Sequence, residues 1–307
     1  MSKYKFGLYD QTNGFDEFQK FHNLLFKNTD ASPQWFQWFF KNARREELIS
    51  PRIYTLRDGD RLIGSWCVEP KHFLHNGWLL RVGRCFSVGI DPEYRRQNLF
   101  VELSNYAIEQ ERSVQKKFDY IFGFPQVGRP VIDAHLKSGW EHVQTIDMYS
   151  TAPQKYDYSI EAFDRVKDFT SKFPKDCSRF YDCSSYLYCR WICHPECTYT
   201  CLEYTEDDNI VLKQYGLACH ILLLKGKHEY VKELLNASKG IAYRHRLEEL
   251  TIWNAHNEHY HDAIVECGFK PGAKFGSSVE LLAVKINETN DLKLETCHFM
   301  MGSEESY

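Results

Sequence analysis

The sequence has little excess charge of either sign. Lysine and arginine together number 38, against 42 aspartate and glutamate residues, for a formal net charge of −4. Proteins that bind nucleic acid or anionic membrane surfaces usually carry a basic patch or a polybasic stretch, and none is visible in this sequence. We therefore expect neither nucleic acid nor a membrane as a partner.

Long apolar runs are missing as well. The first residues, MSKYKFGLYDQTNG, lack the apolar core of a signal peptide. No stretch approaches the length of a membrane span. These absences predict a cytoplasmic protein, in which the 11 cysteines stay as reduced thiols.

Paired metal-ligand motifs are also absent. Five cysteines cluster at spacings of six, four, four and four, without the C-x-x-C pairs of a zinc site. These cysteines are Cys183, Cys189, Cys193, Cys197 and Cys201. A second cluster, of His256, His259 and His261, has no further ligand group of suitable spacing. We expect no metal: the cysteines fit small buried hydrophobic residues, and the histidines fit the polar start of a helix.

Aromatic residues, by contrast, make up 15% of the chain. A helix is expected to begin after Ser32 as the cap, with Pro33 in its first turn. Its aromatic residues are Trp35, Phe36, Trp38, Phe39 and Phe40. They either form a stripe that packs on the core or line a cleft for an acceptor molecule. Trp35 and Trp38 are our candidate substrate-binding residues.

The most informative stretch is SVGIDPEYRRQNLFVEL, residues 87–103. It predicts the end of an apolar strand that starts at Trp78, a turn containing Pro92, and a basic loop that leads into a helix ending near Gln115. The start of a helix has free backbone amides. With arginines beside them, such amides form a site for an anion such as a pyrophosphate.

The order of the other predicted elements fixes the fold class. Strands are expected at residues 4–8, 52–56, 61–68, 118–124 and 142–149, and helices at 15–26 and 130–137, with a polar break at 69–77. Hairpin strands followed by a strand–helix–strand–helix–strand series predict an α/β mixed sheet with a short parallel section. After a stretch with one charged helix, Ile160–Phe173, further strands are expected at 199–204, 210–214, 218–224, 250–254 and 278–286, and helices at 229–242 and 259–267.

Two octapeptides suggest an internal repeat. DAHLKSGW at 133–140 and DAIVECGF at 262–269 share three of eight positions and the glycine–aromatic ending. The match is short enough to arise by chance, but each copy lies between two expected strands, so we predict two similar halves. The first half has the basic loop and His135 where the second has Ile264. We therefore expect the first half to carry the chemistry.

Residues 92–100 resemble the Pro-x-Tyr-Arg-x-x-Gly-x-Gly loop with which GNAT acyltransferases grip the pyrophosphate of coenzyme A. Asn98 replaces the first glycine and tolerates a left-handed backbone. Phe100 replaces the second and adds bulk near the pantetheine. His135 stands at the position of a GNAT tyrosine, four residues before the glycine–aromatic pair.

Two further segments are similar to helical signatures of tandem-GNAT proteins from surface-polysaccharide gene clusters. They are SPQWFQWFFKN near the start and YLYCRWICHP at 186–195, in which Cys189 stands where tryptophan is usual. The resemblance implies two tandem GNAT-like domains: an N-terminal one at 1–152, a linker at 153–185, and a degenerate C-terminal one at 186–307.

The resemblance also implies roles for individual residues, with acyl-CoA as the cosubstrate. The pyrophosphate would be held by Arg95, Arg96, Gln97, Asn98, Leu99 and Phe100. The pantetheine would pair with Phe86, Ser87 and Val88, whose amides would also stabilise the oxyanion. His135 would protonate the leaving thiolate. The base stays open among Glu69, His72, His75 and a water chain, and Phe124 and Gln126 would touch the acceptor or the thioester.

The activity implied is transfer of a 3-hydroxybutanoyl group from CoA to the amino group of a dTDP-linked 3-amino-3,6-dideoxyhexose, for surface polysaccharide biosynthesis. Trp35, Trp38 or Trp191 would offer the nucleotide base a stacking face. The alternatives are another amine acceptor, such as an aminoglycoside, a polyamine or a protein amine, and a non-catalytic ligand-binding relic. The sequence does not distinguish a monomer from an oligomer.

Overall fold

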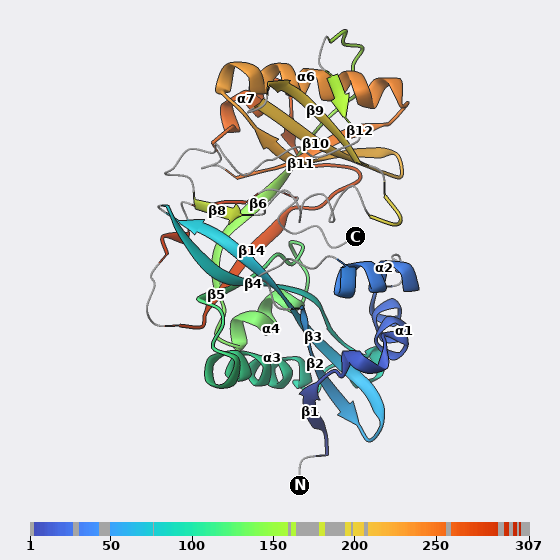
Figure 1. Cartoon of the computed structure of the whole chain (residues 1–307), viewed down its shortest axis with the longest axis vertical. Helices are drawn as coiled ribbons and strands as arrows, with labels where there is room; N and C mark the ends of the chain where they lie inside the picture. Colours follow the sequence, from blue (N-terminus) through green and yellow to red (C-terminus); the bar gives the residue numbers. More distant parts are fainter. Residues whose placement is uncertain are drawn as a thin grey trace.

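One continuous sheet runs through the molecule. The computed structural model describes residues 3–26, 31–42, 50–75, 77–158, 161–163, 178–181, 194–197, 199–205, 208–255, 259–287, 292–294, 297–299 and 301. Within these ranges the strands form a single 15-stranded sheet. Helices pack against it in both the lower and the upper half of the view in Figure 1.

The first half follows the order expected from the sequence. Its strands are β1 Lys5–Leu8, β2 Arg52–Asp58, β3 Arg61–His75, β4 Trp78–Ile90, β5 Tyr120–Gly123 and β6 Glu141–Thr151. Its helical segments are η1 Gln11–Asn13, α1 Asp16–Leu25, α2 Pro33–Gln37, η2 Trp38–Asn42, η3 Pro92–Tyr94, α3 Leu99–Gln110, η4 Glu111–Gln115 and α4 Val131–Lys137. The predicted cap of α2 is confirmed, because Ser32 Oγ accepts a hydrogen bond from Trp35 N at 3.0 Å.

The predicted polar break at 69–77 is wrong for most of its length. These residues continue β3, which pairs with β4 from Glu69 opposite Arg84 to His75 opposite Trp78. The polar side chains of this segment suggested a loop, but a strand can contain them when it is paired on both sides within a sheet. The pairing register that would show this is not visible in the sequence.

Within its described residues, the second half contains short strands and the helices α6 and α7. Its strands are β7 Glu161–Phe163, β8 Ser178–Tyr181, β9 Tyr199–Thr205, β10 Asp208–Tyr215, β11 Ala218–Lys225, β12 Glu249–Asn254, β13 Lys270–Pro271, β14 Val279–Lys285 and β15 Cys297–His298. Its helices are α6 His228–Arg244 and α7 His261–Glu266. The predicted charged helix Ile160–Phe173 is wrong at its described residues, since 161–163 form β7 against β9. The remainder of that segment lies outside the described residues.

The two halves exchange their last strands. The strand order is β1-β2-β3-β4-β5-β14-β6-β12-β11-β10-β9-β7. β14, from the end of the chain, pairs antiparallel with β5, while β6 pairs antiparallel with β12. β14 and β6 also pair with each other, so the two halves are joined through the middle of the sheet (Figure 1).

The two matching octapeptides have the same local structure. Each covers the end of a short helix, α4 or α7, and the residue that closes it is a left-handed glycine, Gly139 at φ 81° and Gly268 at φ 82°. The aromatic residues that follow, Trp140 and Phe269, are both buried. The sequence repeat therefore corresponds to a repeated helix ending.

Two of the hydrophobic cores to which the first half contributes lie on opposite faces of its sheet. On one face, α3 packs over residues that include Cys85 of β4. On the other, α1, α2 and η2 contribute an aromatic cluster that includes Phe86. Successive residues of β4 therefore point to opposite cores, as the strand period of two requires.

Candidate active site at the end of β4

β4 and β5 separate partway along their length. They pair in parallel only from Val82 to Arg84 on β4 and from Tyr120 to Phe122 on β5. β5 ends at Gly123, while β4 continues to Ile90. Beyond Arg84, the backbone edge of β4 that faced β5 is not paired with it. An extended ligand can add main-chain hydrogen bonds to such an edge.

A bulge interrupts β4 within this open stretch. The pairing register between β3 and β4 shifts between Ser65 and Cys67, and the non-glycine Ser87 has φ 46°. Ser65 Oγ donates a hydrogen bond to Ser87 O at 2.8 Å, which fixes the bulge. A left-handed non-glycine residue costs about 1–3 kcal/mol and concentrates at functional sites. The predicted pantetheine segment, Phe86–Val88, spans this bulge.

The loop after β4 presents free amides at the start of α3. Arg96 and Asn98 have φ 65° and 61°, so the expectation that Asn98 takes a left-handed backbone is confirmed. In the described part of the chain, no acceptor binds the amides from Arg96 to Phe100. Consecutive free amides at the N-terminus of a helix of 12 residues form an anion-binding concavity.

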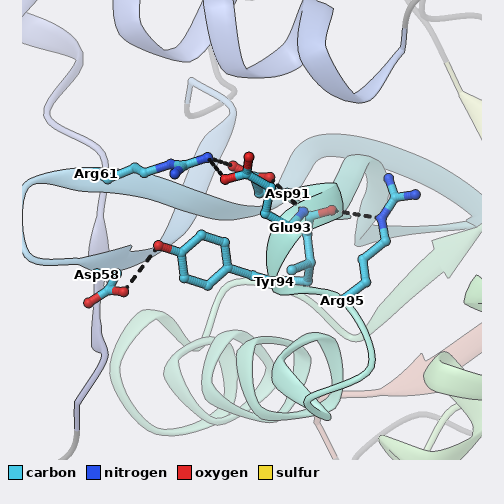
Figure 2. A network of polar contacts seen from close by, with 7 residues as sticks. Asp58, Arg61, Asp91, Glu93, Tyr94 and Arg95 are labelled. Carbon is cyan, nitrogen blue, oxygen red and sulfur yellow. Dashed lines mark hydrogen bonds and ion pairs between the residues drawn. The ribbon is translucent and has the colours of Figure 1, made fainter.

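The turn that leads into this loop is fixed by the β2–β3 hairpin. Arg61 of β3 reaches across to Asp91 at 2.7 Å and Glu93 at 2.6 Å, as Figure 2 shows. The hydrogen bonds that Arg61 donates to Glu93 and Asp91 raise the pKa of Arg61 above its usual value. The single positive charge of Arg61 thus offsets half of the negative charge of these two carboxylates and fixes the turn that leads to the loop.

Tyr94 and Arg95 are fixed in different ways. Tyr94 Oη donates a hydrogen bond to Asp58 Oδ2 at 3.1 Å, on the hairpin side. Arg95 points away from the hairpin (Figure 2), and its Nε donates to Ile90 O at 3.1 Å. Arg95 therefore joins the end of β4 to the loop, a positioning contact that leaves its terminal nitrogens available to a ligand.

His135 lies beside the loop but is buried. It is 2% exposed, and its ring contacts those of Phe100 and Trp140, with centroids 5.1 and 4.5 Å apart. Burial lowers the pKa of His135 to about 3, so the ring is neutral near pH 7. Among the described residues, Nδ1 has no hydrogen-bond partner. In the second half the same position is held by Ile264, which is also buried.

The aromatic residues named for the acceptor lie inside the cluster under α1 and α2. Trp35 and Trp38 are 1% and 5% exposed. Trp35 stacks on Phe39 with centroids 5.0 Å apart, and Phe39 in turn contacts Phe86 at 5.2 Å. The cluster therefore supports the open stretch of β4. Trp191 lies outside the described residues.

The two residues predicted beyond β5 make contacts of their own. Phe124 is 7% exposed and stacks on Trp253 with centroids 5.7 Å apart. Gln126 Oε1 accepts hydrogen bonds from Arg129 Nε and Nη2 at 3.0 and 2.8 Å. A role for either side chain toward a substrate stays a prediction.

The corresponding turn in the second half is filled by the chain itself. At the start of α6, Lys227 N donates to Asp208 Oδ1 at 2.7 Å. Gly226 N donates to Tyr260 Oη at 3.0 Å, and this hydroxyl donates back to Gly226 O at 2.9 Å. Asp208 is 1% exposed. A buried carboxylate thus stands at the N-terminus of α6, whereas the amides at the start of α3 are open.

The sequence analysis missed Arg84 and Asp208. Arg84 is an ionisable residue inside the apolar strand WLLRVGRCFSVGI, a signal that could have singled it out. Its buried ion pair with Glu69, at 2.8 Å, depends on strand register and was not predictable. Nothing in the sequence marks Asp208, because its contact with Lys227 bridges two separate elements.

The described part of the chain holds no group of three or more histidine, cysteine, aspartate or glutamate side chains placed to bind a metal ion. Of the cysteine cluster, Cys201 is buried and Cys197 is partly exposed, while the other three lie outside the described residues. His261 Nδ1 lies 3.1 Å from Asn254 Nδ2. Among the described helices, none has the length and apolar character needed to cross a membrane.

No protein-family model and no curated protein matches the chain. Solved structures do match it over most of its length. A GCN5-related N-acetyltransferase from Anabaena variabilis has a TM-score of 0.63 at 12% identity, over 92% of this chain and 73% of that one. A tandem GNAT protein from the clavulanic acid biosynthesis pathway has a TM-score of 0.59 at 8% identity, over 94% and 100%.

A third similar structure is the N-myristoyltransferase of Saccharomyces cerevisiae with bound myristoyl-CoA. Its TM-score is 0.60 at 10% identity, over 92% of this chain and 83% of that one. Likeness at such low identity establishes the fold alone. The chain therefore has the GCN5-related N-acetyltransferase fold, with two GNAT-like halves joined in one sheet.

Proposed function

We propose that this protein is an acyl-CoA-dependent N-acyltransferase whose first half binds the acyl-CoA. One observation carries the proposal: the part of β4 beyond its pairing with β5 leads directly into the free amides at the start of α3. An edge for an extended chain beside a concavity for an anion suits a thioester arm that ends in a pyrophosphate. Among proteins of similar fold, the yeast N-myristoyltransferase binds myristoyl-CoA.

The residues present fit this ligand. The amides from Arg96 to Phe100, with the side chains of Arg95 and Arg96, would hold the pyrophosphate. Phe86, Ser87 and Val88 would pair with the pantetheine, and amides at the bulge would stabilise the oxyanion. An oxyanion donor of this kind is worth about 3–4 kcal/mol of barrier.

His135 is our candidate for the group that assists the leaving thiolate. Because burial keeps its ring neutral, it would act as an N–H hydrogen-bond donor rather than as an imidazolium ion. Its contact with Phe100, at the start of α3, supports a position beside the cofactor. If the role of His135 were purely structural, an apolar side chain of similar size at this position would support the same thiol release.

The acceptor we propose is a nucleotide-linked amino sugar, with a dTDP-linked 3-amino-3,6-dideoxyhexose and a 3-hydroxybutanoyl donor as the first pair to test. This finer assignment rests on the resemblance of SPQWFQWFFKN and YLYCRWICHP to helical signatures of tandem-GNAT proteins from surface-polysaccharide gene clusters. Trp35 and Trp38 would have to become accessible for a nucleotide base to stack on them.

Free-thiol release is the test. The full chain is incubated with acetyl-CoA or 3-hydroxybutanoyl-CoA, with and without the amino sugar, and CoA binding is measured separately by calorimetry. We expect thiol release that needs both the hydroxyacyl thioester and the sugar. Release with other amines alone would replace the acceptor and keep the enzyme class. CoA binding without release for any amine would overturn the catalytic proposal in favour of a binding relic.

A further inference from the structure

A buried ion pair joins β3 and β4 under the aromatic cluster. Arg84 Nε donates to Glu69 Oε2 at 2.8 Å, and the two residues stand opposite each other in the strand register. Arg84 is 1% exposed and Glu69 is 7% exposed. The Arg84 guanidinium also lies over the ring of Phe86, 5.1 Å from its centroid. Among the two charges, the carboxylate is thus the one nearer to solvent.

Stability does not account for this pair. Replacing a buried ion pair by well-packed apolar residues is often neutral or stabilising, because desolvation of the two charges offsets their attraction. The immediate neighbours of Arg84 on β4, Gly83 and Cys85, are not charged, but Lys71, two residues beyond Glu69 on β3, is also buried. The position of the pair in the sheet offers a better reason for its presence.

Glu69 lies level with the point where β4 and β5 separate. Its partner Arg84 is the last residue of β4 that pairs with β5. The other two candidates for the base are farther down the same strand, His72 opposite Arg81 and His75 opposite Trp78. At about 3.3 Å per residue they lie about 10 and 20 Å from the level of Glu69. The strand register therefore favours Glu69 over both histidines.

The pair also faces the side of the sheet away from α3. Arg84 and Phe86 alternate with Cys85, and Phe86 belongs to the cluster under α1 and α2 while Cys85 belongs to the core under α3. A pyrophosphate at the start of α3 and a molecule at Glu69 would thus approach β4 from different sides. Two substrates could therefore meet at this strand without competing for the same face.

We propose that Glu69, oriented by Arg84, binds the acceptor amine and takes its proton; this assignment rests on the proposed function. The neutral amine attacks the thioester carbonyl, the C–N bond forms, and the C–S bond breaks with its electron pair on sulfur. The nitrogen gives one proton to the Glu69 carboxylate, which returns it to solvent. The thiolate takes up one proton, so the exchange balances. The ligand class is a primary amine, and Arg84 is a positioning residue.

The test compares Glu69→Gln with a matched control, Glu111→Gln. Glu111 is also a buried glutamate held by an arginine, since Arg52 binds both of its oxygens at 2.7 and 2.6 Å. It lies in η4 at the end of α3, in a contact that our proposal does not use. Both variants remove one buried carboxylate from an Arg–Glu pair. Because Glu111 also accepts a hydrogen bond from Tyr54 Oη at 2.7 Å, Glu111→Gln should lose at least as much stability as Glu69→Gln.

Each full-length variant is assayed for thiol release with 3-hydroxybutanoyl-CoA and the dTDP-linked 3-amino sugar, and for CoA affinity by calorimetry. Binding of the amino sugar and of its 3-hydroxy analogue to the CoA-saturated chain is measured as well. We expect Glu69→Gln to lower kcat/KM for the amine by roughly 100-fold or more with CoA affinity unchanged. It should also abolish the preference for the amino sugar over its hydroxy analogue. Glu69→Asp should recover part of both.

The opposing results are distinct. If Glu69→Gln weakened binding of the amino sugar and of its 3-hydroxy analogue equally, or released thiol as fast as Glu111→Gln, Glu69 would not contact the amine. Either result would overturn the Glu69 assignment and leave the proposed function in place. If the wild-type chain itself releases no thiol with any amine, the proposed function fails first and the Glu69 assignment falls with it. The two failures are told apart by the wild-type assay.

Discussion

His135 in the first of the two matching octapeptides corresponds to an isoleucine in the second. In the second half, Ile264 stands at the same place before the same left-handed glycine, and both side chains are buried. His135 Nδ1 lacks a partner among the described residues, and an unsatisfied buried polar atom costs about 1–3 kcal/mol. A residue kept at such a cost suggests a use other than packing.

We predict that His135→Ile separates stability from activity. The substitution removes the unsatisfied nitrogen, so the free energy of unfolding should stay level or rise by about 1 kcal/mol, while thiol release falls. Urea unfolding and the thiol assay measure the two effects. Full activity in a stable His135→Ile variant would remove His135 from the mechanism.

The same substitution should change the response to acid. Burial lowers the pKa of His135 from 6.5 to about 3, so the unfolded chain binds a proton that the folded chain refuses. Stability from this residue is complete above pH 6.5 and is lost as the pH falls toward 3. By linkage, the wild type should lose about 2 kcal/mol through this residue between pH 7 and pH 5. His135→Ile should lose about that much less over the same interval, measured by urea unfolding at both pH values. If the wild type and His135→Ile lost equal stability between pH 7 and pH 5, His135 would not be buried in solution.

Asn98 allows a charge to be placed in the loop with little change of shape. Aspartate tolerates the left-handed backbone nearly as well as asparagine, so Asn98→Asp should fold. A carboxylate beside the open amides should repel a pyrophosphate, and we predict roughly tenfold weaker CoA binding by calorimetry, about 1.4 kcal/mol. The control is Asn105→Asp, which adds the same charge at an exposed site in α3. If the two variants bind CoA equally well, the pyrophosphate does not lie at the loop.

At the scale of single elements, the starts of α3 and α6 are opposites. The first has open amides, and the second has the Asp208 carboxylate as an acceptor. Gly226 makes that contact possible, because a Cβ there would stand 2.7 Å from Asp208 Oδ1. The second half therefore resembles the first in shape while its own side chains fill the corresponding anion position.

This contrast predicts a stoichiometry of one CoA per chain. Asp208→Ala should leave that stoichiometry unchanged, because Tyr260 still fills the turn, but should lower the free energy of unfolding by about 1 kcal/mol through loss of the helix cap. Calorimetry gives the stoichiometry, and urea unfolding gives the stability. Two equivalents of CoA on the wild-type chain would contradict our interpretation of the second half.

Elements also mark where sequence reasoning succeeds and where it stops. The loop and α3 follow from local signals, a proline turn and residues that favour a left-handed backbone, so the sequence alone indicated them. The extension of β3 did not, because residues such as Glu69 and His72 appear polar until their partners on β4 are known. The same holds for the buried aromatic helix: its composition was clear, but burial of Trp35 and Trp38 depends on tertiary packing.

At the scale of the whole molecule, the exchange of β6 and β14 was beyond local reasoning. β14 pairs with β5 although more than half of the chain separates them in sequence. Hydrophobic periodicity identifies such strands but does not assign their partners. The exchange means that a half without its partner would expose unpaired strand edges, which promote aggregation.

The halves should accordingly unfold together, and a lesion in β14 should damage the first half. Leu282 lies in β14 but is fully buried in the core under α3. Leu282→Ala should lower the free energy of unfolding by about 2–5 kcal/mol and speed amide exchange in β5, the strand it pairs with. Val265→Ala, at an exposed site on α7, is the control and should change stability by less than about 0.5 kcal/mol. Urea unfolding should show one transition in both variants, whereas a separate transition for each half, with β5 unaffected by Leu282→Ala, would mean that the shared sheet does not couple them.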